Sequence, residues 1–269
     1  MHRTRYLTPP GRASRPRPAA PALVAVAHGS RDPRASHTVA ALLERVRELR
    51  PGLDVRLGHI ELNAPLLPDA LHALGAGEAV LVPLLLGRGH HVKHDIPACV
   101  ADAPALRARV AGALGPHPLL VETLHDRLTE AGWHPSDRGN RDSAVVLAAA
   151  GSRDPESAAD TRRTARLLGE RLGGVPVVPA YASAASPTVP AAVRALAARG
   201  HRRIAVASYF TAPGRFASAA AAHAPWIAAA PLGAHPAMAR LVLHRYDQAR
   251  AAGAAVYDIP MNTRFPAPA

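Results

Sequence analysis

The sequence predicts an α/β fold made of two tandem homologous units, each a parallel sheet with helices on both faces. Short apolar runs alternate with longer amphipathic segments, which is typical of βαβ units. The chain also repeats itself, because "ALVAVAHGSRDPRASHT" at 22–38 returns as "AVVLAAAGSRDPESAADT" at 144–161. We expect a flavodoxin-like strand order in each unit and a cleft between the units.

Two further matches keep the same order and spacing, at 63–74 with 184–196 and at 79–86 with 203–210. The duplication predicts units over 22–131 and 144–250, joined by a polar linker over 132–143. Residues 1–21 are basic, rich in proline and without an apolar face, so we predict a disordered tail there. Residues 251–269 are expected to form a C-terminal tail.

The elements of the first unit follow from its apolar pattern. Strands are expected near 22–27, 53–59, 79–85 and 109–113, and helices near 34–50, 66–74, 95–105 and 118–131. The repeated "GSRDP" predicts two helix starts, since Asp32 and Asp154 can cap helices whose first residues are Pro33 and Pro155. This repeat therefore has a structural explanation.

Composition excludes several classes of protein. Although 48% of the 269 residues are hydrophobic, no apolar run reaches the roughly 20 residues of a membrane helix. The single cysteine, Cys99, excludes an intrachain disulfide framework. The N-terminus lacks the features of a secretory signal, so a cytoplasmic location without membrane contact is expected.

The net charge of +12 raises the question of a nucleic-acid partner. Five arginines lie in the predicted N-terminal tail, the other basic residues are spread out, and aromatic residues make up only 4%. We therefore expect no nucleic-acid partner. A dinucleotide site is also not expected, because "GRGHH" lacks the glycine spacing of that fingerprint.

Three chemically active residues occur in the first unit only. His28, Glu61 and His91 each follow a predicted strand, where the second unit has Ala150, Ser183 and Arg215. Carboxyl ends of parallel strands share one edge of a sheet and neighbouring strands are about 4.8 Å apart, so the three side chains are expected to converge. Two imidazoles suit cobalt, nickel, zinc or ferrous iron, and a carboxylate can act as ligand or accept a proton.

Other polar residues near this edge have more than one interpretation. Arg31 and Lys93 are either ordinary surface charges or partners for substrate carboxylates. His90 and His94 contact either substrate or solvent, because adjacent side chains of an extended segment point in opposite directions. The remaining first-unit histidines considered, which we interpret as hydrogen-bonded turn residues, are His59, His72, His117 and His125.

The segments "AHGSRDPRA", "IELNAPLLPDAL" and "VPLLLGRGHHVKHDIP", in this order, resemble the sirohydrochlorin chelatases of the CbiX type, the class II tetrapyrrole chelatases. The resemblance covers residues 22–250, since long members of that family are fused duplications. It implies ATP-independent insertion of cobalt or ferrous iron into sirohydrochlorin, in cobalamin or sirohaem biosynthesis, with no organic cofactor. It also implies that His28 and His91 bind the metal and that Glu61 is the accompanying acid.

The second unit departs from this pattern at all three positions, so we expect it to supply cleft wall and substrate contacts. Arg31, Arg153 and Arg215 are expected to pair with carboxylates of the tetrapyrrole. The resemblance further implies a monomer with an internal pseudo-dimer. The alternative is a metal-trafficking protein that uses the same histidines without tetrapyrrole chemistry.

Overall fold

The computed structural model describes residues 20–252, so the tails predicted over 1–21 and 251–269 lie almost entirely outside this range. The first unit contains β1 (Ala22–Ala27), α1 (Pro33–Leu49), β2 (Val55–His59), α2 (Leu67–His72), β3 (Gly77–Pro83), the π-helical turn η1 (His91–Asp95), α3 (Ile96–Ala101), β4 (Leu106–Val110) and α4 (Pro118–Glu130). The second contains the 3₁₀ turn η2 (Pro135–Asp137), β5 (Ser143–Ala149), α5 (Pro155–Arg171), β6 (Val177–Tyr181), α6 (Val189–Ala198), β7 (Arg203–Tyr209), α7 (Arg215–Ala221), β8 (Ile227–Ala228) and α8 (Pro236–Ala251).

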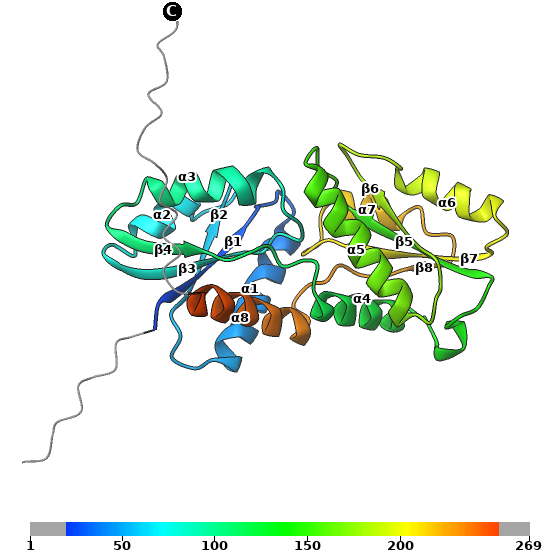
Figure 1. Cartoon of the computed structure of the whole chain (residues 1–269), viewed down its shortest axis with the longest axis horizontal. Helices are drawn as coiled ribbons and strands as arrows, with labels where there is room; N and C mark the ends of the chain where they lie inside the picture. The colour runs from blue at the N-terminus through cyan, green and yellow to red at the C-terminus, as the bar shows by residue number, and fades with distance from the viewer. Residues whose placement is uncertain (1–19, 253–269) are drawn as a thin grey trace, which may run out of the picture.

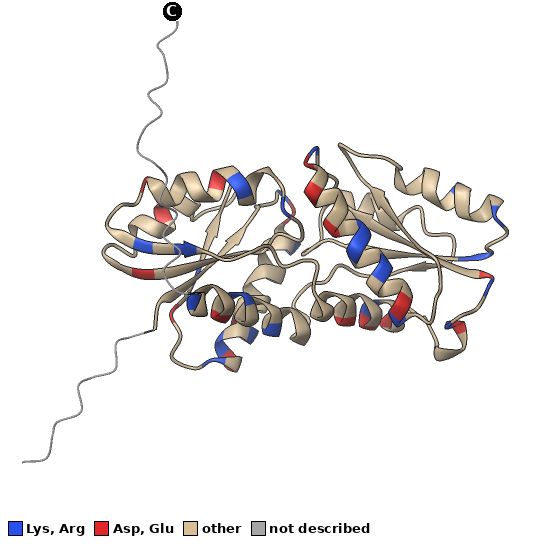
Figure 2. Cartoon of the chain, in the orientation of Figure 1, with Lys and Arg blue, Asp and Glu red and all other residues tan. Residues whose placement is uncertain are grey.

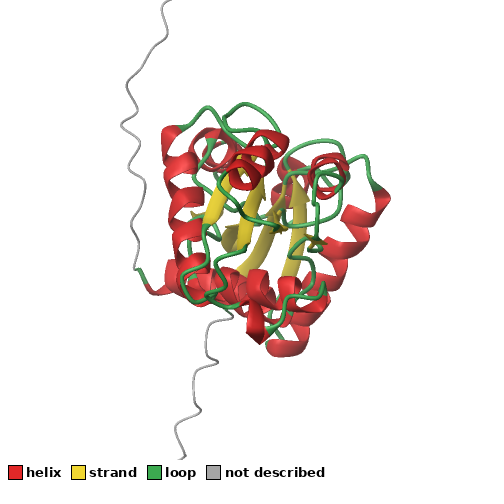
Figure 3. Ribbon diagram, turned by 90° about the vertical axis from the view of Figure 1, so that its right-hand side faces the viewer, coloured by secondary structure: helices red, strands yellow, loops and turns green. Residues whose placement is uncertain are grey.

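Both units form four-stranded parallel sheets, with strand orders β2-β1-β3-β4 and β6-β5-β7-β8. Each sheet lies between helices, as Figure 3 shows. In β1, Leu23 packs toward the face covered by α1, and Val24 packs toward α2 and α3. The observed strand orders confirm the predicted flavodoxin-like order. The predicted fold class is also confirmed, because helices bury both faces of each parallel sheet.

The last helix of each unit packs on the other unit. Helix α4 contacts α5 and β7, whereas α8 contacts α1, β3 and β4. Figure 1 shows α8 beneath the first sheet and α4 beneath the second. One continuous apolar core consequently includes Leu42 of α1, Leu124 of α4, Leu168 of α5 and Leu241 of α8. Each unit thus completes its core with a helix from the other.

The N-caps predicted from the repeated motif are confirmed. The Asp32 carboxylate accepts a hydrogen bond from the backbone N–H of Arg34, and Asp154 accepts one from that of Glu156. Helices α1 and α5 each begin at the following proline. Both helices therefore start at equivalent points of the repeat, directly beside the carboxyl ends of β1 and β5.

Two boundaries differ from the sequence-based expectation. Strand β4 begins at Leu106, three residues early, because Leu106, Ala108 and Val110 alternate onto the face packed against the core of α2 and α3. The helix expected from 95 begins as a π-helical turn at His91 and ends at Ala101. Its end precedes Pro104, since the residue before a proline is disfavoured in helical conformation.

The segment predicted as a polar linker is packed against the second unit. Trp133 is only 1% exposed and its ring centroid lies 5.5 Å from that of Trp226. The buried carboxylate of Asp137 forms an ion pair with Arg203 at 3.0 Å. The connection between the units is therefore held by an aromatic pair and an ion pair, in each of which one partner, Trp133 or Asp137, is buried.

Charged residues of both signs are distributed over both units in Figure 2. Across residues 20–252, no helix combines the length and apolar character that crossing a membrane requires.

Candidate functional site

The loop after β1 lies directly against the loop after β2. The backbone N–H of Glu61 donates to the carbonyl oxygen of His28 at 3.0 Å. Gly29 has φ +102°, and a Cβ built on it would lie 1.8 Å from the carbonyl oxygen of Glu61. Glycine is needed here because no side chain fits and the backbone is left-handed. This close approach makes His28 and Glu61 neighbours.

The second unit repeats the same backbone arrangement without the active side chains. The N–H of Ser183 donates to the carbonyl oxygen of Ala150 at 2.9 Å. A Cβ on Gly151, at φ +93°, would again lie 1.8 Å from a carbonyl oxygen, that of Ser183. The backbone therefore supports the expected equivalence of Ala150 with His28 and of Ser183 with Glu61.

The structure brings His28, Glu61 and His91 together. The ring centroids of His28 and His91 are 4.8 Å apart, with the rings nearly perpendicular. The Nδ1 atom of His28 lies 3.4 Å from Oε1 of Glu61. The three side chains are partly exposed, at 47%, 53% and 35% for His28, Glu61 and His91. They are thus reachable from solvent.

His91 is oriented by a carboxylate that the sequence analysis missed. Its Nδ1 lies 2.5 Å from Oδ2 of Asp95, across the single π-helical turn. Each imidazole of the pair therefore has its Nδ1 beside a carboxylate, and within residues 20–252 neither Nε2 takes part in a hydrogen bond or ion pair. A carboxylate on one ring nitrogen typically fixes the other nitrogen as a metal ligand. The spacing of His91 and Asp95 could have revealed this pairing.

The described part of the chain holds no group of three or more His, Cys, Asp or Glu side chains arranged to bind a metal ion. Two imidazoles that hold an ion together leave most of its coordination positions to water or to another ligand. That donor set suits an ion that is passed on.

These residues line a cleft of about 1230 Å³ between the two units. The first unit contributes His28, Glu61 and His91, and the facing wall includes Phe210 and Arg215. Arg31 also lines the cleft. Among residues 20–252, neither Arg31 nor Arg215 forms an ion pair, although the Arg215 guanidinium lies 4.9 Å from the Phe216 ring centroid. The cleft therefore combines apolar walls with two positive charges available to an anion.

Two other predicted substrate contacts lie elsewhere. Lys93 points to the second unit, where its Nζ is 2.6 Å from both Asp154 and Glu156. Arg153 lines a separate depression together with His90. The structure therefore does not bring Lys93 or Arg153 to the wall of the main cleft.

The remaining histidines fall into two groups. His90 lines both the main cleft and the smaller depression, and its ring centroid is 4.7 Å from that of His94. By contrast, His59 is buried with its Nδ1 3.2 Å from the Pro65 carbonyl oxygen, and His117 caps α4. The hydrogen bonds expected of His59 and His117 are therefore present, whereas His72 and His125 lie in helices α2 and α4 and not in turns; His125 pairs with Asp126.

Comparison with known proteins adds independent evidence. The chain is 29% identical over 173 residues to the sirohydrochlorin ferrochelatase of Bacillus subtilis (strain 168), covering 62% of this chain and 64% of that protein. It is 26% identical over 196 residues to the sirohydrochlorin cobaltochelatase of Priestia megaterium, covering 69% and 62% respectively. The chain therefore spans just under two thirds of the length of these two relatives.

The fold is shared with SirB from Bacillus subtilis, whose structure was solved with Fe³⁺, at a TM-score of 0.68 and 24% identity. The matched region covers 86% of this chain and 95% of that one. The sequence model of the CbiX family matches twice, at residues 22–131 and 144–249. Because the two matches fall on the two repeated units and together cover most of the sequence, the chain belongs to the CbiX family.

Proposed function

We propose that this protein inserts a divalent metal ion, Co²⁺ or Fe²⁺, into sirohydrochlorin. The observation that carries the proposal is the pair of adjacent imidazoles, His28 and His91, each with a carboxylate beside its Nδ1 atom, at the wall of a large cleft. Membership of the CbiX family supports it, since relatives at 29% and 26% identity are a sirohydrochlorin ferrochelatase and a sirohydrochlorin cobaltochelatase.

The metal ion is a substrate, and the residues of the first unit prepare it for transfer. Neutral imidazoles replace part of its water shell through nitrogen lone pairs, and the other positions stay open for the pyrrole nitrogens of the macrocycle. Insertion breaks two pyrrole N–H bonds, whose electron pairs form bonds to the metal. We assign Glu61 as acceptor of one proton, with water accepting the other, because its carboxylate is exposed beside His28.

The cleft between the units binds the tetrapyrrole, mainly through side chains of the second unit. A cleft of about 1230 Å³ accommodates a macrocycle, because it exceeds the roughly 300–1,000 Å³ of ordinary small-molecule sites. The carboxylates of sirohydrochlorin pair with Arg31 and Arg215, whose planar guanidinium groups suit such partners. The apolar walls contributed by Phe210 and Phe216 contact the ring. Since one chain supplies both walls, we propose that the monomer is the active form.

An insertion assay tests this proposal. The full chain is mixed with sirohydrochlorin and either Co²⁺ or, without oxygen, Fe²⁺, and the absorption spectrum is followed with no ATP present. We expect insertion well above the rate without protein. Metal binding combined with an unaccelerated spectral change would contradict the proposal and support metal trafficking instead.

A further inference from the structure

The loop that carries His91 is attached to the second unit before it reaches the histidine. The Tyr209 hydroxyl donates to the carbonyl oxygen of Leu86 at 3.1 Å, and the Thr211 hydroxyl donates to that of Leu84 at 3.0 Å. Both hydroxyls come from the end of β7 or the residues just after it. The polypeptide leaving β3 is therefore fixed by hydrogen bonds that its backbone carbonyl groups accept from side chains of the second unit.

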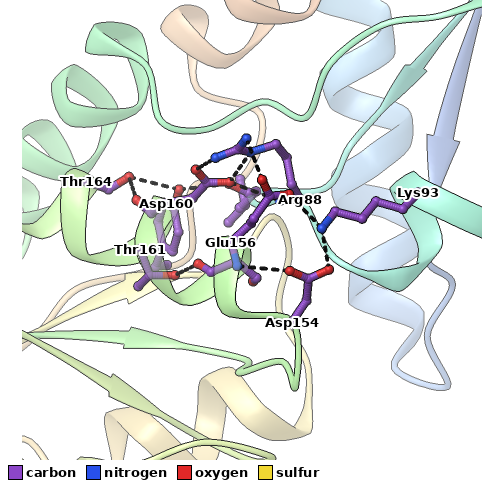
Figure 4. A network of polar contacts seen from close by, with 10 residues as sticks. Arg88, Lys93, Asp154, Glu156, Asp160, Thr161 and Thr164 are labelled. Carbon is purple, nitrogen blue, oxygen red and sulfur yellow. Dashed lines mark hydrogen bonds and ion pairs between the residues drawn. The ribbon is translucent and has the colours of Figure 1, made fainter.

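Arg88 strengthens this attachment through a buried carboxylate. Its Nε and Nη2 donate to Asp160 at 3.0 and 2.8 Å, and its backbone N–H donates to the same carboxylate at 3.1 Å. The Asp160 side chain is only 4% exposed, on helix α5 (Figure 4). Removing the partner of a buried charge is costly, so this bidentate pair has one strongly preferred geometry.

Lys93 forms a second attachment on the other side of His91. Its Nζ lies between the carboxylates of Asp154 and Glu156, at 2.6 Å from each (Figure 4). Arg88 and Lys93 flank His91 in the sequence, and both reach the first turns of α5.

We propose that Arg88 and Lys93 are positioning residues that clamp the His91 loop onto α5 and thereby hold His91 beside His28. The proposal rests on the metal-binding role proposed above. It also gives the second unit, which lacks the histidine pair, a task in metal binding. His91 lies on a π-helical turn joined to a loop, so its distance from His28 depends on what holds that loop.

A Co²⁺ titration of the full chain without tetrapyrrole tests the clamp. Arg88→Gln and Asp160→Asn should each weaken Co²⁺ binding about 10-fold, the lower end of the range for groups that orient metal ligands. Arg88→Lys should recover part of the loss because it keeps the charge. Lys93→Gln, at a more exposed position, should weaken binding less and provides a variant that is not expected to disturb the core.

The matched control is Arg50→Gln. Arg50 forms a bidentate pair with Asp247, with both contacts at 2.7 Å, and likewise joins the two units, but at the contact of α1 with α8. The substitution Arg50→Gln should lower the melting temperature without changing the affinity for Co²⁺. In insertion kinetics, Arg88→Gln should raise KM for the metal while leaving KM for sirohydrochlorin unchanged.

Two results would overturn the clamp alone: wild-type Co²⁺ affinity in Arg88→Gln and Lys93→Gln, or an equal loss of affinity in Arg50→Gln. If Arg88→Gln does not fold, Lys93→Gln decides between these outcomes. A wild-type protein that binds no Co²⁺ would instead overturn the proposed function, and this proposal with it.

Discussion

The Nδ1 atom of His91 lies 2.5 Å from Oδ2 of Asp95, and the two residues bound one π-helical turn. The carboxylate leaves Nε2 as the ring nitrogen available to a metal and increases its basicity. His91 was predicted from the sequence as a metal ligand, whereas its pairing with Asp95 was not predicted.

Asp95→Asn should therefore weaken Co²⁺ binding about 10- to 100-fold, because an amide orients the ring less strongly than a carboxylate does. Isothermal titration of the full chain with Co²⁺ measures the change. Asp102→Asn, at the other end of α3, is the control and should bind as the wild type does. Equal affinity in both variants would show that Asp95 does not support the site.

Arg215→Ala should weaken binding of the metal-free tetrapyrrole about 10-fold or more, the usual effect of losing a hydrogen bond to a charged group. KM for the metal should stay unchanged, because arginine has no lone pair for an ion. Fluorescence titration with sirohydrochlorin measures the affinity. Arg199→Ala, at the exposed end of α6, should have no effect; an unaltered affinity in Arg215→Ala would remove this residue from the substrate site.

Gly29→Ala and Gly151→Ala form a matched pair, since both place a Cβ 1.8 Å from an equivalent carbonyl oxygen. Each should lower the free energy of unfolding by about 2 kcal/mol or more, through left-handed strain and the clash. Only Gly29→Ala should also reduce insertion per folded molecule, because it displaces Glu61. Urea unfolding and insertion rates measure the two effects. Similar insertion activity in both variants would contradict the prediction that only the loop containing Gly29 takes part in insertion.

Stability should fall in mild acid because of His117. Its Nδ1 accepts a hydrogen bond from the N–H of Leu119 at 3.1 Å, which requires the neutral ring. Burial, aided by the positive charge of Arg245 and by His244, lowers the pKa of His117 from 6.5 to about 4. The unfolded chain thus binds a proton that the folded chain does not, so stability present above pH 6.5 is lost progressively as the pH falls from 6.5 to about 4.

The substitution His117→Asn tests this, since asparagine caps a helix without titrating in this range and the cap is worth about 1 kcal/mol. Melting temperatures at pH 7 and pH 4.5 should differ less in this variant than in the wild type. The exposed His72, replaced in the same way, is the control. If His117→Asn leaves the difference in melting temperature between pH 7 and pH 4.5 unchanged, other groups cause the acid sensitivity.

The fold was predictable because its signals are local or repeated. Short apolar runs marked the strands, the repeat gave the two units, and Asp32 and Asp154 marked equivalent helix starts. The exchange of α4 and α8 was not predictable in this way, because it depends on which sheet each apolar helix face meets. Periodicity reveals that a face is apolar but not what covers it.

The candidate site likewise contains residues whose positions were predictable from the sequence and residues whose contacts were not. His28, Glu61 and His91 follow strand ends, so topology alone brought them to one edge of the sheet. Lys93 was assigned to substrate, whereas its partners, Asp154 and Glu156, lie in the other unit and pair with it only after the units meet. Single-residue patterns do not encode such distant pairings.

The central claim is that His28 and His91 of the first unit hold the metal, whereas Arg215 of the second unit helps to hold the tetrapyrrole. The most direct measurement determines insertion rate and metal-free tetrapyrrole affinity for His28→Ala, His91→Ala and Arg215→Ala. We predict that each histidine variant loses insertion by about 100-fold or more, since losing a ligand costs at least as much as losing the group that orients it. Both should still bind the tetrapyrrole, whereas Arg215→Ala should lose mainly that binding. Wild-type turnover of His91→Ala at limiting metal would contradict the account.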